Sequence, residues 1–324
     1  GVLDVVRDYG ARGDGVTDDT DAIQRALDDG GSNRIVYLPD GEYRISRQLK
    51  FRPSAAADSS KGGHKRSILQ GQSQTGTVIR LIDHCPGFQE KPTRTSKKHK
   101  EVIESGVGVI WTGTAPAQRF RNAIRNLTID TGSGNPAASG LQFVANNQGC
   151  VREVTIRSGD GSGHAGLDLS YTGQNGPLLV EDLIVEGFEI GIHGNAFNSA
   201  TFERVTLSGQ QFAGVSSNAC LFFRGLTSRN AVPVFDLDAF YSNVVVVDSQ
   251  FFGMGREGVP AMRSDGRLYL RNVRIEEYAE GLRHSDPGAA ELAPDGETEI
   301  TEYTSHPLTD IESSEALRLP IAEV

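Results

Sequence analysis

The stretch Asn126-Leu127-Thr128-Ile129 decides the fold, because it recurs along the chain as a polar residue followed by alternating apolar positions. Counted from Leu127 to Val154, Leu183, Val205 and Leu226, the steps are 27, 29, 22 and 21 residues. A repeat of this length is typical of one coil of a β-helix, and loops account for the longer steps. Each coil buries its apolar residues against the next, so the sequence predicts a stack of mutually dependent coils. The copies are Asn126-Leu127-Thr128-Ile129, Glu153-Val154-Thr155-Ile156, Asp182-Leu183-Ile184-Val185, Arg204-Val205-Thr206-Leu207, Gly225-Leu226-Thr227 and Asn272-Val273-Arg274-Ile275.

The residues before this repeat predict a strand, a helix and two further strands. The helix is expected around Ala22-Ile23-Gln24-Arg25-Ala26-Leu27, whose apolar residues share one face, with capping side chains supplied by Thr17-Asp18-Asp19-Thr20. The strands that follow are expected at 35–38 and 41–45. Four acids precede or open the helix, at Asp14, Asp18, Asp19 and Asp21, but they lack the pattern and closing Glu of a calcium loop. We therefore interpret them as turn and cap residues, and we expect neither a metal nor a cofactor.

These opening motifs carry a resemblance. Asp8-Tyr9-Gly10-Ala11, Gly13-Asp14-Gly15, Thr17-Asp18-Asp19-Thr20 and Val36-Tyr37-Leu38-Pro39-Asp40-Gly41 resemble the opening signature of the pectate-lyase-like superfamily. The resemblance implies an all-β chain, a right-handed parallel β-helix whose short N-terminal α-helix caps one end. We expect one β-helix domain over 1–285 with its cap in 1–50. Residues 286–324 are expected to be either a packed extended segment or a linker to a second β-helix, and we favour the linker.

The composition restricts the classes of partner. The formal net charge is −10, so the positive stripe that nucleic acid or an anionic membrane surface requires is absent overall. No apolar run approaches the roughly 18 residues of a membrane span. A neutral glycan is compatible with this charge, whereas a polyuronate needs a local basic patch. We expect a polysaccharide or oligosaccharide partner, no nucleic acid and no membrane.

A second set of repeat strands predicts a ladder of polar side chains. Strands that open with Gly or another small residue place an apolar residue inward and the next one outward. Stacking the coils about 4.8 Å apart gives an outward column of Gln142, Asp168, His193, Ser216 and Asp236, and a neighbouring column of Val144, Ser170, Asn195, Asn218 and Asp238. Acids, amides and hydroxyls suit a hydroxyl-rich sugar. The alternative is that these positions are polar because they face solvent.

Two acid–base arrangements are possible within the ladder. Asp236 and Asp238 are two residues apart on one strand, so their Cα atoms lie roughly 6.5–7 Å apart on the same face. Inverting glycosidases require an acid and a base with room for a water between them. Asp168 beside His193 is the other candidate, because a carboxylate orients the ring and raises the pKa of the histidine. A pair without catalytic meaning is the alternative in each case.

A closer resemblance covers roughly residues 105–230. Ile124-Arg125-Asn126-Leu127-Thr128-Ile129-Asp130, Ala138-Ser139-Gly140-Leu141-Gln142-Phe143 and Gly191-Ile192 with Asn195 resemble the first β-helix of two-module exo-β-1,3-glucanases. In that family the site lies between two tandem β-helices, the general acid is a Glu of the second, and polar side chains of the first position the attacking water. The resemblance implies a second β-helix as a partner, and a secreted or cell-surface location. The substrate-binding candidates are Gln142, Asn147, Ser170, Tyr171, Asn195, Ser216 and Asn218.

These observations favour a glycoside hydrolase of the exo-β-1,3-glucanase type, acting by inversion, or one module of such an enzyme. Its catalytic candidates are Asp236, Asp238, Asp168 and His193. One alternative is a non-catalytic glycan-binding or structural β-helix, such as a tailspike-like module. Another is a polysaccharide lyase.

Overall fold

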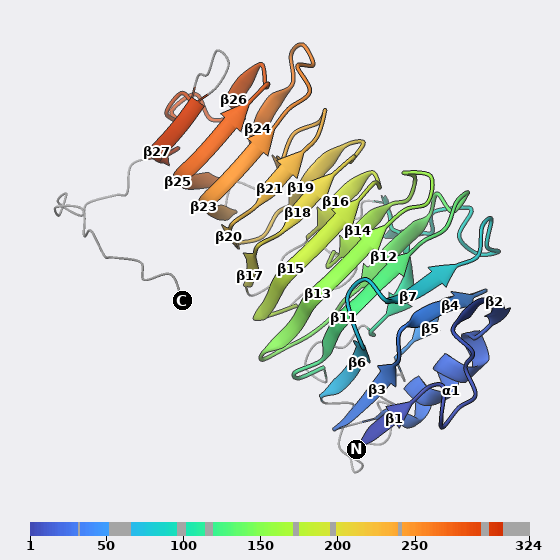
Figure 1. The fold of residues 1–324 in the computed structure, drawn as a ribbon. Helices are drawn as coiled ribbons and strands as arrows, with labels where there is room; N and C mark the ends of the chain where they lie inside the picture. Colours follow the sequence, from blue (N-terminus) through green and yellow to red (C-terminus); the bar gives the residue numbers. More distant parts are fainter. Residues whose placement is uncertain are drawn as a thin grey trace.

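The computed structural model describes residues 1–31, 33–51, 66–95, 102–113, 119–170, 175–194, 199–238, 242–292 and 298–306. The chain winds into an elongated right-handed parallel β-helix, with the N-terminal helix at one end (Figure 1). The fold class predicted from the repeat is confirmed. Among the described residues, no helix has the length and apolar character needed to span a membrane.

Two sheets run along the body of the described chain. Sheet A contains parallel strands together with one antiparallel strand, β27, at the C-terminal end. Its strands are β1 (Val2–Asp4), β2 (Asp14–Asp18), β3 (Arg34–Leu38), β4 (Gly41–Ile45), β6 (Ser67–Gly71), β7 (Thr77–Leu81), β11 (Ala123–Asp130), β13 (Gly149–Arg157), β15 (Leu178–Glu186), β17 (Ala200–Glu203), β18 (Thr206–Ser208), β20 (Leu221–Arg224), β21 (Thr227–Arg229), β23 (Asn243–Phe252), β25 (Arg267–Glu276) and β27 (Thr298–Thr304).

Sheet B is parallel throughout and contains the strands that carry the predicted polar ladder. These are β5 (Leu49–Lys50), β10 (Val107–Trp111), β12 (Ala138–Gln142), β14 (Ala165–Asp168), β16 (Ile190–His193), β19 (Ala213–Ser217), β22 (Phe235–Leu237), β24 (Pro260–Ser264) and β26 (Glu280–His284). A separate antiparallel hairpin is formed by β8 (Thr93–Thr95) and β9 (Val102–Glu104).

The residue that opens each repeat has a left-handed backbone conformation, and this conformation favours Asn, Asp or Gly there. All six openers have a positive φ in the left-handed region: 57° at Asn126, 53° at Asp182, 52° at Asn272 and 70° at Gly225, but also 53° at Glu153 and 52° at Arg204. Asn, Asp and Gly adopt this conformation at the lowest steric cost. At these positions sheet A turns a corner, so each coil has three β faces although the strands on both sides of the corner join into one sheet.

The glycines that open the strands of sheet B mark close packing between the sheets. A Cβ atom at Gly140 would lie 2.1 Å from Ile156 Cγ2, and one at Gly166 would lie 2.3 Å from Val185 Cγ1. Any side chain at these positions would therefore clash with core residues of sheet A. The glycine fixes the distance between the sheets and hence the position of the outward residues that follow it.

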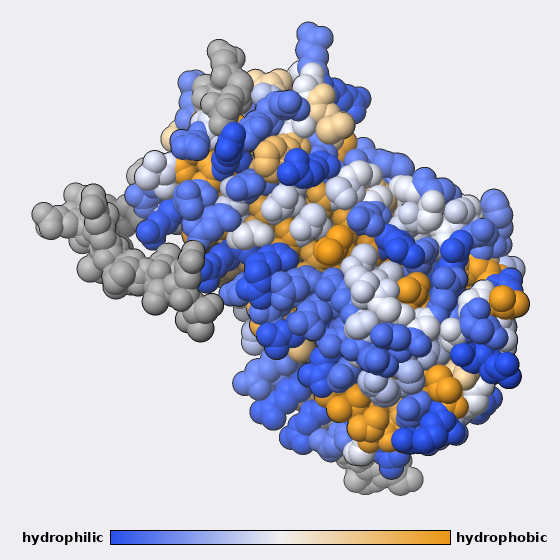
Figure 2. All heavy atoms as spheres, viewed as in Figure 1, coloured by the Kyte–Doolittle hydropathy of each residue, from blue (hydrophilic) through white to orange (hydrophobic). Residues whose placement is uncertain are grey.

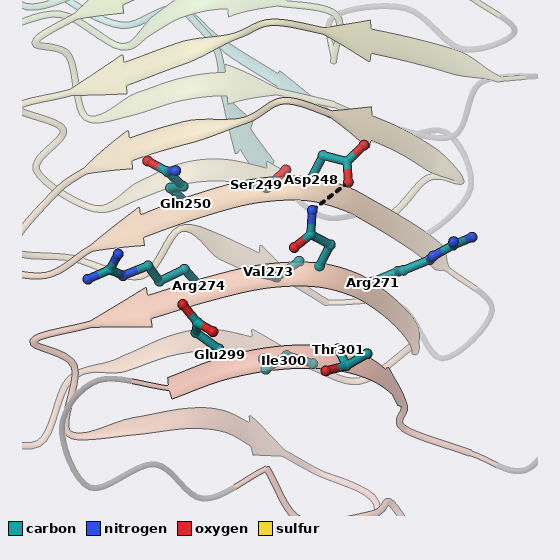
Figure 3. A pocket seen from close by; sticks show the side chains of 10 residues that line it. Asp248, Ser249, Gln250, Arg271, Val273, Arg274, Glu299, Ile300 and Thr301 are labelled. Atoms are coloured by element: carbon teal, nitrogen blue, oxygen red, sulfur yellow. Dashed lines mark hydrogen bonds between the residues drawn. The ribbon is translucent and has the colours of Figure 1, made fainter. Parts of the chain in front are cut away.

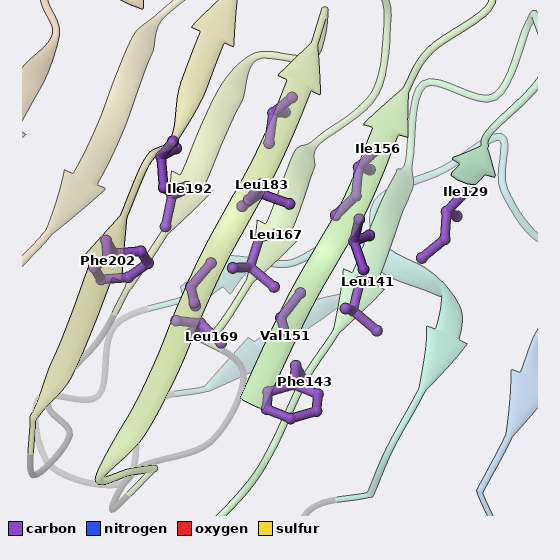
Figure 4. Packing of buried hydrophobic residues seen from close by; sticks show 14 of the residues in the cluster. Ile129, Leu141, Phe143, Val151, Ile156, Leu167, Leu169, Leu183, Ile192 and Phe202 are labelled. Atoms are coloured by element: carbon purple, nitrogen blue, oxygen red, sulfur yellow. The ribbon is translucent and has the colours of Figure 1, made fainter. Parts of the chain in front are cut away.

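The core lies between the two sheets and is built from the inward residues of successive coils (Figure 4). Leu141, Leu167 and Ile192 stack along sheet B and are at most 1% exposed. Further along, the ring centroids of Phe202 and Phe223 lie 4.4 Å apart in a parallel stack. Each such buried side chain contributes about 1.5–3 kcal/mol by leaving water, so the coils stabilise one another.

The single helix of the described chain, α1 (Thr20–Asp29), covers the N-terminal end of the core. It buries Ala22, Ile23, Ala26 and Leu27, as its pattern predicts. Asp18 Oδ1 accepts a hydrogen bond from Thr20 N at 3.0 Å. The buried carboxylate of Asp19 instead accepts hydrogen bonds from the backbone nitrogens of Arg12 and Gly13, so it folds the preceding turn and makes no side-chain cap.

The C-terminal segment follows the packed alternative of the sequence analysis over part of its length. Thr298–Thr304 forms β27, which pairs antiparallel with β25. This strand covers the edge of sheet A that the last coil would otherwise expose. The tail or linker expected in 286–324 includes residues 307–324, which lie outside the described residues. The viewed face of the molecule is mostly hydrophilic, with small separated hydrophobic areas (Figure 2).

Candidate functional site

The predicted ladder exists as a column of side chains in register. Gln142 pairs with Asp168, Asp168 with His193, His193 with Ser216 and Ser216 with Asp236. The register follows because every coil places its small opening residues and its inward apolar residue at the same level. The column continues beyond the prediction, through Trp111 and Lys50 at one end and Arg263 and Arg283 at the other.

The Asp168 end of the ladder is buried and hydrogen-bonded. Asp168 is 0% exposed. One carboxylate oxygen accepts hydrogen bonds from Gln142 Nε2 at 3.0 Å and from Ser139 Oγ at 3.4 Å. The other accepts from the backbone nitrogen and the hydroxyl of Ser170, at 2.9 and 2.7 Å. A carboxylate satisfied by four protein donors is held rigidly in place.

Ser170 links Asp168 to His193. The Ser170 hydroxyl lies 3.2 Å from His193 Nδ1. Because that hydroxyl donates its proton to Asp168, it accepts from His193, which places the proton on Nδ1. The predicted couple of Asp168 and His193 is thus connected through the hydroxyl of Ser170, and the half-buried His193 is oriented by it.

Three residues beside this end were not in the prediction. His164 lies edge-on to His193, with ring centroids 5.4 Å apart. Its Nδ1 is 3.6 Å from Glu189 Oε2, and the same carboxylate pairs with Lys91. Burial lowers the pKa of His164 and outweighs the nearby carboxylate of Asp168, which raises it; the charge of Lys91 lowers the pKa further, against Glu189. The net effect favours the neutral form of the ring.

The Asp236 end of the ladder is more open. Asp236 Oδ1 lies 3.1 Å from Arg263 Nε, and the Asp236 side chain is 24% exposed. Burial raises the pKa of Asp236, and the nearby carboxylates of Asp238 and Asp265 raise it further, against the opposing effect of Arg263. Asp238 follows directly after β22 and is exposed. The predicted acid pair is therefore accessible, and one member retains its proton to higher pH than a free Asp does.

An exposed aromatic residue, also absent from the prediction, belongs to this open end. Phe212 precedes β19, and its ring centroid lies 5.4 Å from the guanidinium carbon of Arg263. His164, Glu189 and Phe212 occupy equivalent positions, each two residues before the glycine of a sheet B strand. All three residues could therefore have been found in the sequence from their spacing to that glycine.

The remaining predicted residues differ in how close they are to the ladder. Ser216 is in the column, and Asn218 follows the same strand; both are half-buried. Val144, expected in the neighbouring outward column, is 0% exposed. Asn147 is exposed in the turn before β13 with φ 48°, a conformation that Asn tolerates. Tyr171 and Asn195 lie outside the described residues.

A groove of about 540 Å³ lies elsewhere, at the corner of sheet A near the C-terminal end. It is lined mostly by polar side chains of β23, β25 and β27, together with Val273 and Ile300, and contains the hydrogen bond from Asn272 to Asp248 (Figure 3). Arg274 and Glu299 face each other across paired strands. None of the predicted site residues lines this groove, and two of its charged residues, Asp248 and Arg274, already pair with Arg224 and Glu276 outside it, so it does not replace the ladder as the candidate site.

Comparisons with known proteins find similarity to proteins named as carbohydrate-active enzymes. The chain is 30% identical to a glucan 1,3-beta-glucosidase of Cochliobolus carbonum over 214 residues, which cover 61% of this chain and 24% of that protein. It is 42% identical to alginate lyase 7 of Azotobacter vinelandii over 90 residues, 27% of this chain and 10% of that protein. The chain thus spans at most about a quarter of the length of these two relatives.

A similar solved structure is the A-module of the mannuronan C-5 epimerase AlgE4 of Azotobacter vinelandii, with a TM-score of 0.46 and 16% identity over 88% of this chain and 91% of that module. The profile of a protein family, described as rhamnogalacturonase A/epimerase, pectate lyase-like, matches residues 4–231. This match includes the N-terminal cap and the coils as far as β21, most of the described β-helix. The chain therefore belongs to the pectate lyase-like family of rhamnogalacturonase A and epimerases.

Proposed function

We propose that this protein is an enzyme acting on polysaccharide, a glycoside hydrolase that inverts the configuration of the anomeric carbon at the open end of the ladder. The observation that carries the proposal is the pairing of Asp236, whose pKa is raised by burial and by its acidic neighbours, with the exposed Asp238. Hydrolysis by inversion requires one protonated and one ionised carboxyl group.

The environments of the two acids assign their roles. Asp236 keeps its proton to higher pH and donates it to the leaving glycosidic oxygen as the general acid. The more exposed Asp238 acts as the general base on a water molecule. Strand geometry separates the two Cα atoms by roughly 6.5–7 Å, a span compatible with the carboxyl separation of about 6.5–9.5 Å found in inverting enzymes.

The buried end of the ladder would position the substrate and the histidine. Asp168, Gln142 and Ser170 are all buried and therefore inaccessible to a sugar, so the contribution of Asp168 passes through Ser170 to the half-buried His193. The proton on Nδ1 of His193 directs its other ring nitrogen away from Ser170. His193, Ser216 and Asn218 then offer polar contacts to sugar hydroxyls along the same face.

The glucan 1,3-beta-glucosidase relative supports β-1,3-glucan as the substrate, since its similarity extends over 61% of this chain. Because the chain covers 24% of that protein, we include a second β-helix module or chain as a partner in the proposal. A polysaccharide substrate also implies a secreted or cell-surface location.

The test is product formation from laminarin, polygalacturonate and alginate, measured by new reducing ends and by ultraviolet absorbance together. The proposal predicts reducing ends from laminarin without absorbance, and nuclear magnetic resonance of the fresh product should show the inverted anomer. Loss of activity in both Asp236→Asn and Asp238→Asn would assign the pair. Binding of a glycan without any product would identify a glycan-binding module, and the proposal of hydrolysis would then be wrong.

β-Elimination by a polysaccharide lyase is the second candidate. The 42% identity to alginate lyase 7 favours it, as does a histidine oriented by a hydroxyl and a buried carboxylate, because elimination begins with proton abstraction by a base. A lyase would generate an unsaturated, ultraviolet-absorbing product from alginate or polygalacturonate, and that product would depend on His193 and not on Asp236.

A further inference from the structure

The exposed ring of Phe212 lies beside the proposed acid pair. Phe212 is 46% exposed. It belongs to the coil before Asp236, whereas Arg263 belongs to the coil after it, so the ring and the guanidinium approach each other across the coil of Asp236. Arg263 contacts both the ring and the carboxylate. Phe212, Asp236 and Arg263 therefore form one contiguous surface.

The fold does not require an aromatic residue at this position. The equivalent residues of the two preceding coils are His164 and Glu189, which are polar. Leaving apolar surface in water is unfavourable by about 25 cal/mol per Å², and Phe212 gains little of that back from the core. An exposed ring next to titratable groups matches the apolar face of a sugar, whose axial C–H groups pack on aromatic rings.

The charges around the ring select among sugars. Asp238 and Asp265 lie near Asp236, and the guanidinium of Arg263 is already paired with Asp236. In the next coil, Arg283 pairs with Glu280. The two described cations that continue the column beyond Asp236 are thus already paired with acids, and unscreened carboxylates repel a uronate.

We infer that Phe212 is a substrate-positioning residue, a platform on which an uncharged pyranose residue adjacent to the scissile bond stacks. The inference rests on the proposed function, because it places the sugar over Asp236 and Asp238. It adds a specificity determinant that favours neutral glycans over polyuronates.

Phe222 provides a matched control. It is 45% exposed, almost as much as Phe212, but it lies on β20 in sheet A. Truncating either ring removes a similar exposed apolar surface, so a general effect on stability or solubility would appear in both variants.

The experiment measures binding in a background without hydrolysis. Laminarin oligosaccharides and oligogalacturonates are titrated calorimetrically into Asp236→Asn alone and combined with Phe212→Ala, Phe212→Trp or Phe222→Ala. We expect about three- to tenfold weaker binding of the neutral sugar with Phe212→Ala, recovery with Phe212→Trp and no change with Phe222→Ala. In the hydrolytically active chain, Phe212→Ala should raise KM more than it lowers kcat.

Equal affinity of the Phe212→Ala and Phe222→Ala variants for laminarin oligosaccharides would overturn the platform. Tighter binding of oligogalacturonate than of the neutral sugar would also overturn it, and so would the absence of binding to either glycan. The proposed function fails on a separate observation. If Asp236→Asn still hydrolyses laminarin while Phe212→Ala still weakens binding, the acid assignment is wrong and the platform stands.

Discussion

The Asp168 end and the Asp236 end of the ladder occupy the same column of side chains. They differ in burial, in hydrogen bonding and in the ion pair of the carboxylate. Asp168 is fully buried and accepts four hydrogen bonds from protein donors. Asp236, three coils further along, is partly exposed, pairs with one guanidinium and has a raised pKa. The comparison shows that register places a carboxylate on the outward face, while its neighbours decide whether it holds structure or exchanges a proton.

Because the two carboxylates have such different surroundings, we expect different consequences when each of them is removed. Removing the charge of Asp236 should affect chemistry and leave the fold intact. Removing Asp168 should affect the fold first, because its donors would be left without an acceptor. The predictions that follow test that division, beginning with the largest expected effect.

The largest effect is expected for Asp236→Asn. Loss of the general acid should lower kcat by about 10²–10⁴-fold, the usual contribution of a positioned proton donor. The free energy of unfolding should change by less than about 0.5 kcal/mol, because the group is partly exposed and amide and carboxyl have similar size. Reducing-end assays and urea unfolding measure the two quantities.

Asp248→Asn is the control for this prediction. Asp248 is a partly exposed acid at a corner of sheet A, away from the ladder. Its replacement should leave kcat unchanged. If Asp236→Asn and Asp248→Asn lost activity equally, the loss would not be specific to the open end of the ladder, and the assignment of Asp236 as the general acid would be wrong.

Asp168→Ala should produce the largest loss of stability among these variants. The change strands the donors of Gln142, Ser139 and Ser170 in a buried setting, at about 3 kcal/mol in total. Urea unfolding should show an earlier midpoint with an unchanged slope. A fully stable Asp168→Ala protein that has lost only activity would make Asp168 a catalytic group and would contradict the comparison.

The ladder itself was predictable because it depends on local rules. The opening Gly, the inward aliphatic and the outward polar residue recur in the sequence, and parallel stacking of equal coils brings them into register. The hydrogen bonds at Asp168 were not predictable, because Ser170 approaches it from beyond the strand end. The contact of Phe212 with Arg263 spans residues 51 positions apart and depends on side-chain reach.

The end of the domain shows another limit of the repeat. The sequence of 298–304 has no coil partner and no copy of the repeat motif, so periodicity could not identify it as a strand. Its pairing runs antiparallel to β25, and such a pairing arises from an uncovered sheet edge. The interpretation of the acids before α1 was right in part: Asp14 and Asp19 accept hydrogen bonds from backbone groups of the turn, but no side chain caps the helix.

Ser170→Ala tests the link between the two parts of the ladder. The hydroxyl connects Asp168 to His193, and its loss removes one buried hydrogen bond at a cost of about 1 kcal/mol. The Nδ1 chemical shift of His193, followed by nuclear magnetic resonance, should change, because Nδ1 loses the acceptor that orients it. Ser216→Ala serves as the control on the neighbouring coil, and it should leave the Nδ1 environment of His193 unchanged.

The smallest and most specific effect is a displacement of the pH dependence. A general acid works while protonated, so kcat should fall as the pH rises through the pKa of Asp236. Asp265 raises that pKa and Arg263 lowers it. Asp265→Asn should therefore move the alkaline limb of the profile to lower pH, and Arg263→Gln should move it to higher pH. Profiles measured at low salt, where these charges are least screened, check both directions. Two shifts of the same sign would mean that the limb belongs to a group other than Asp236, because a single carboxyl between an anion and a cation must respond oppositely to their removal.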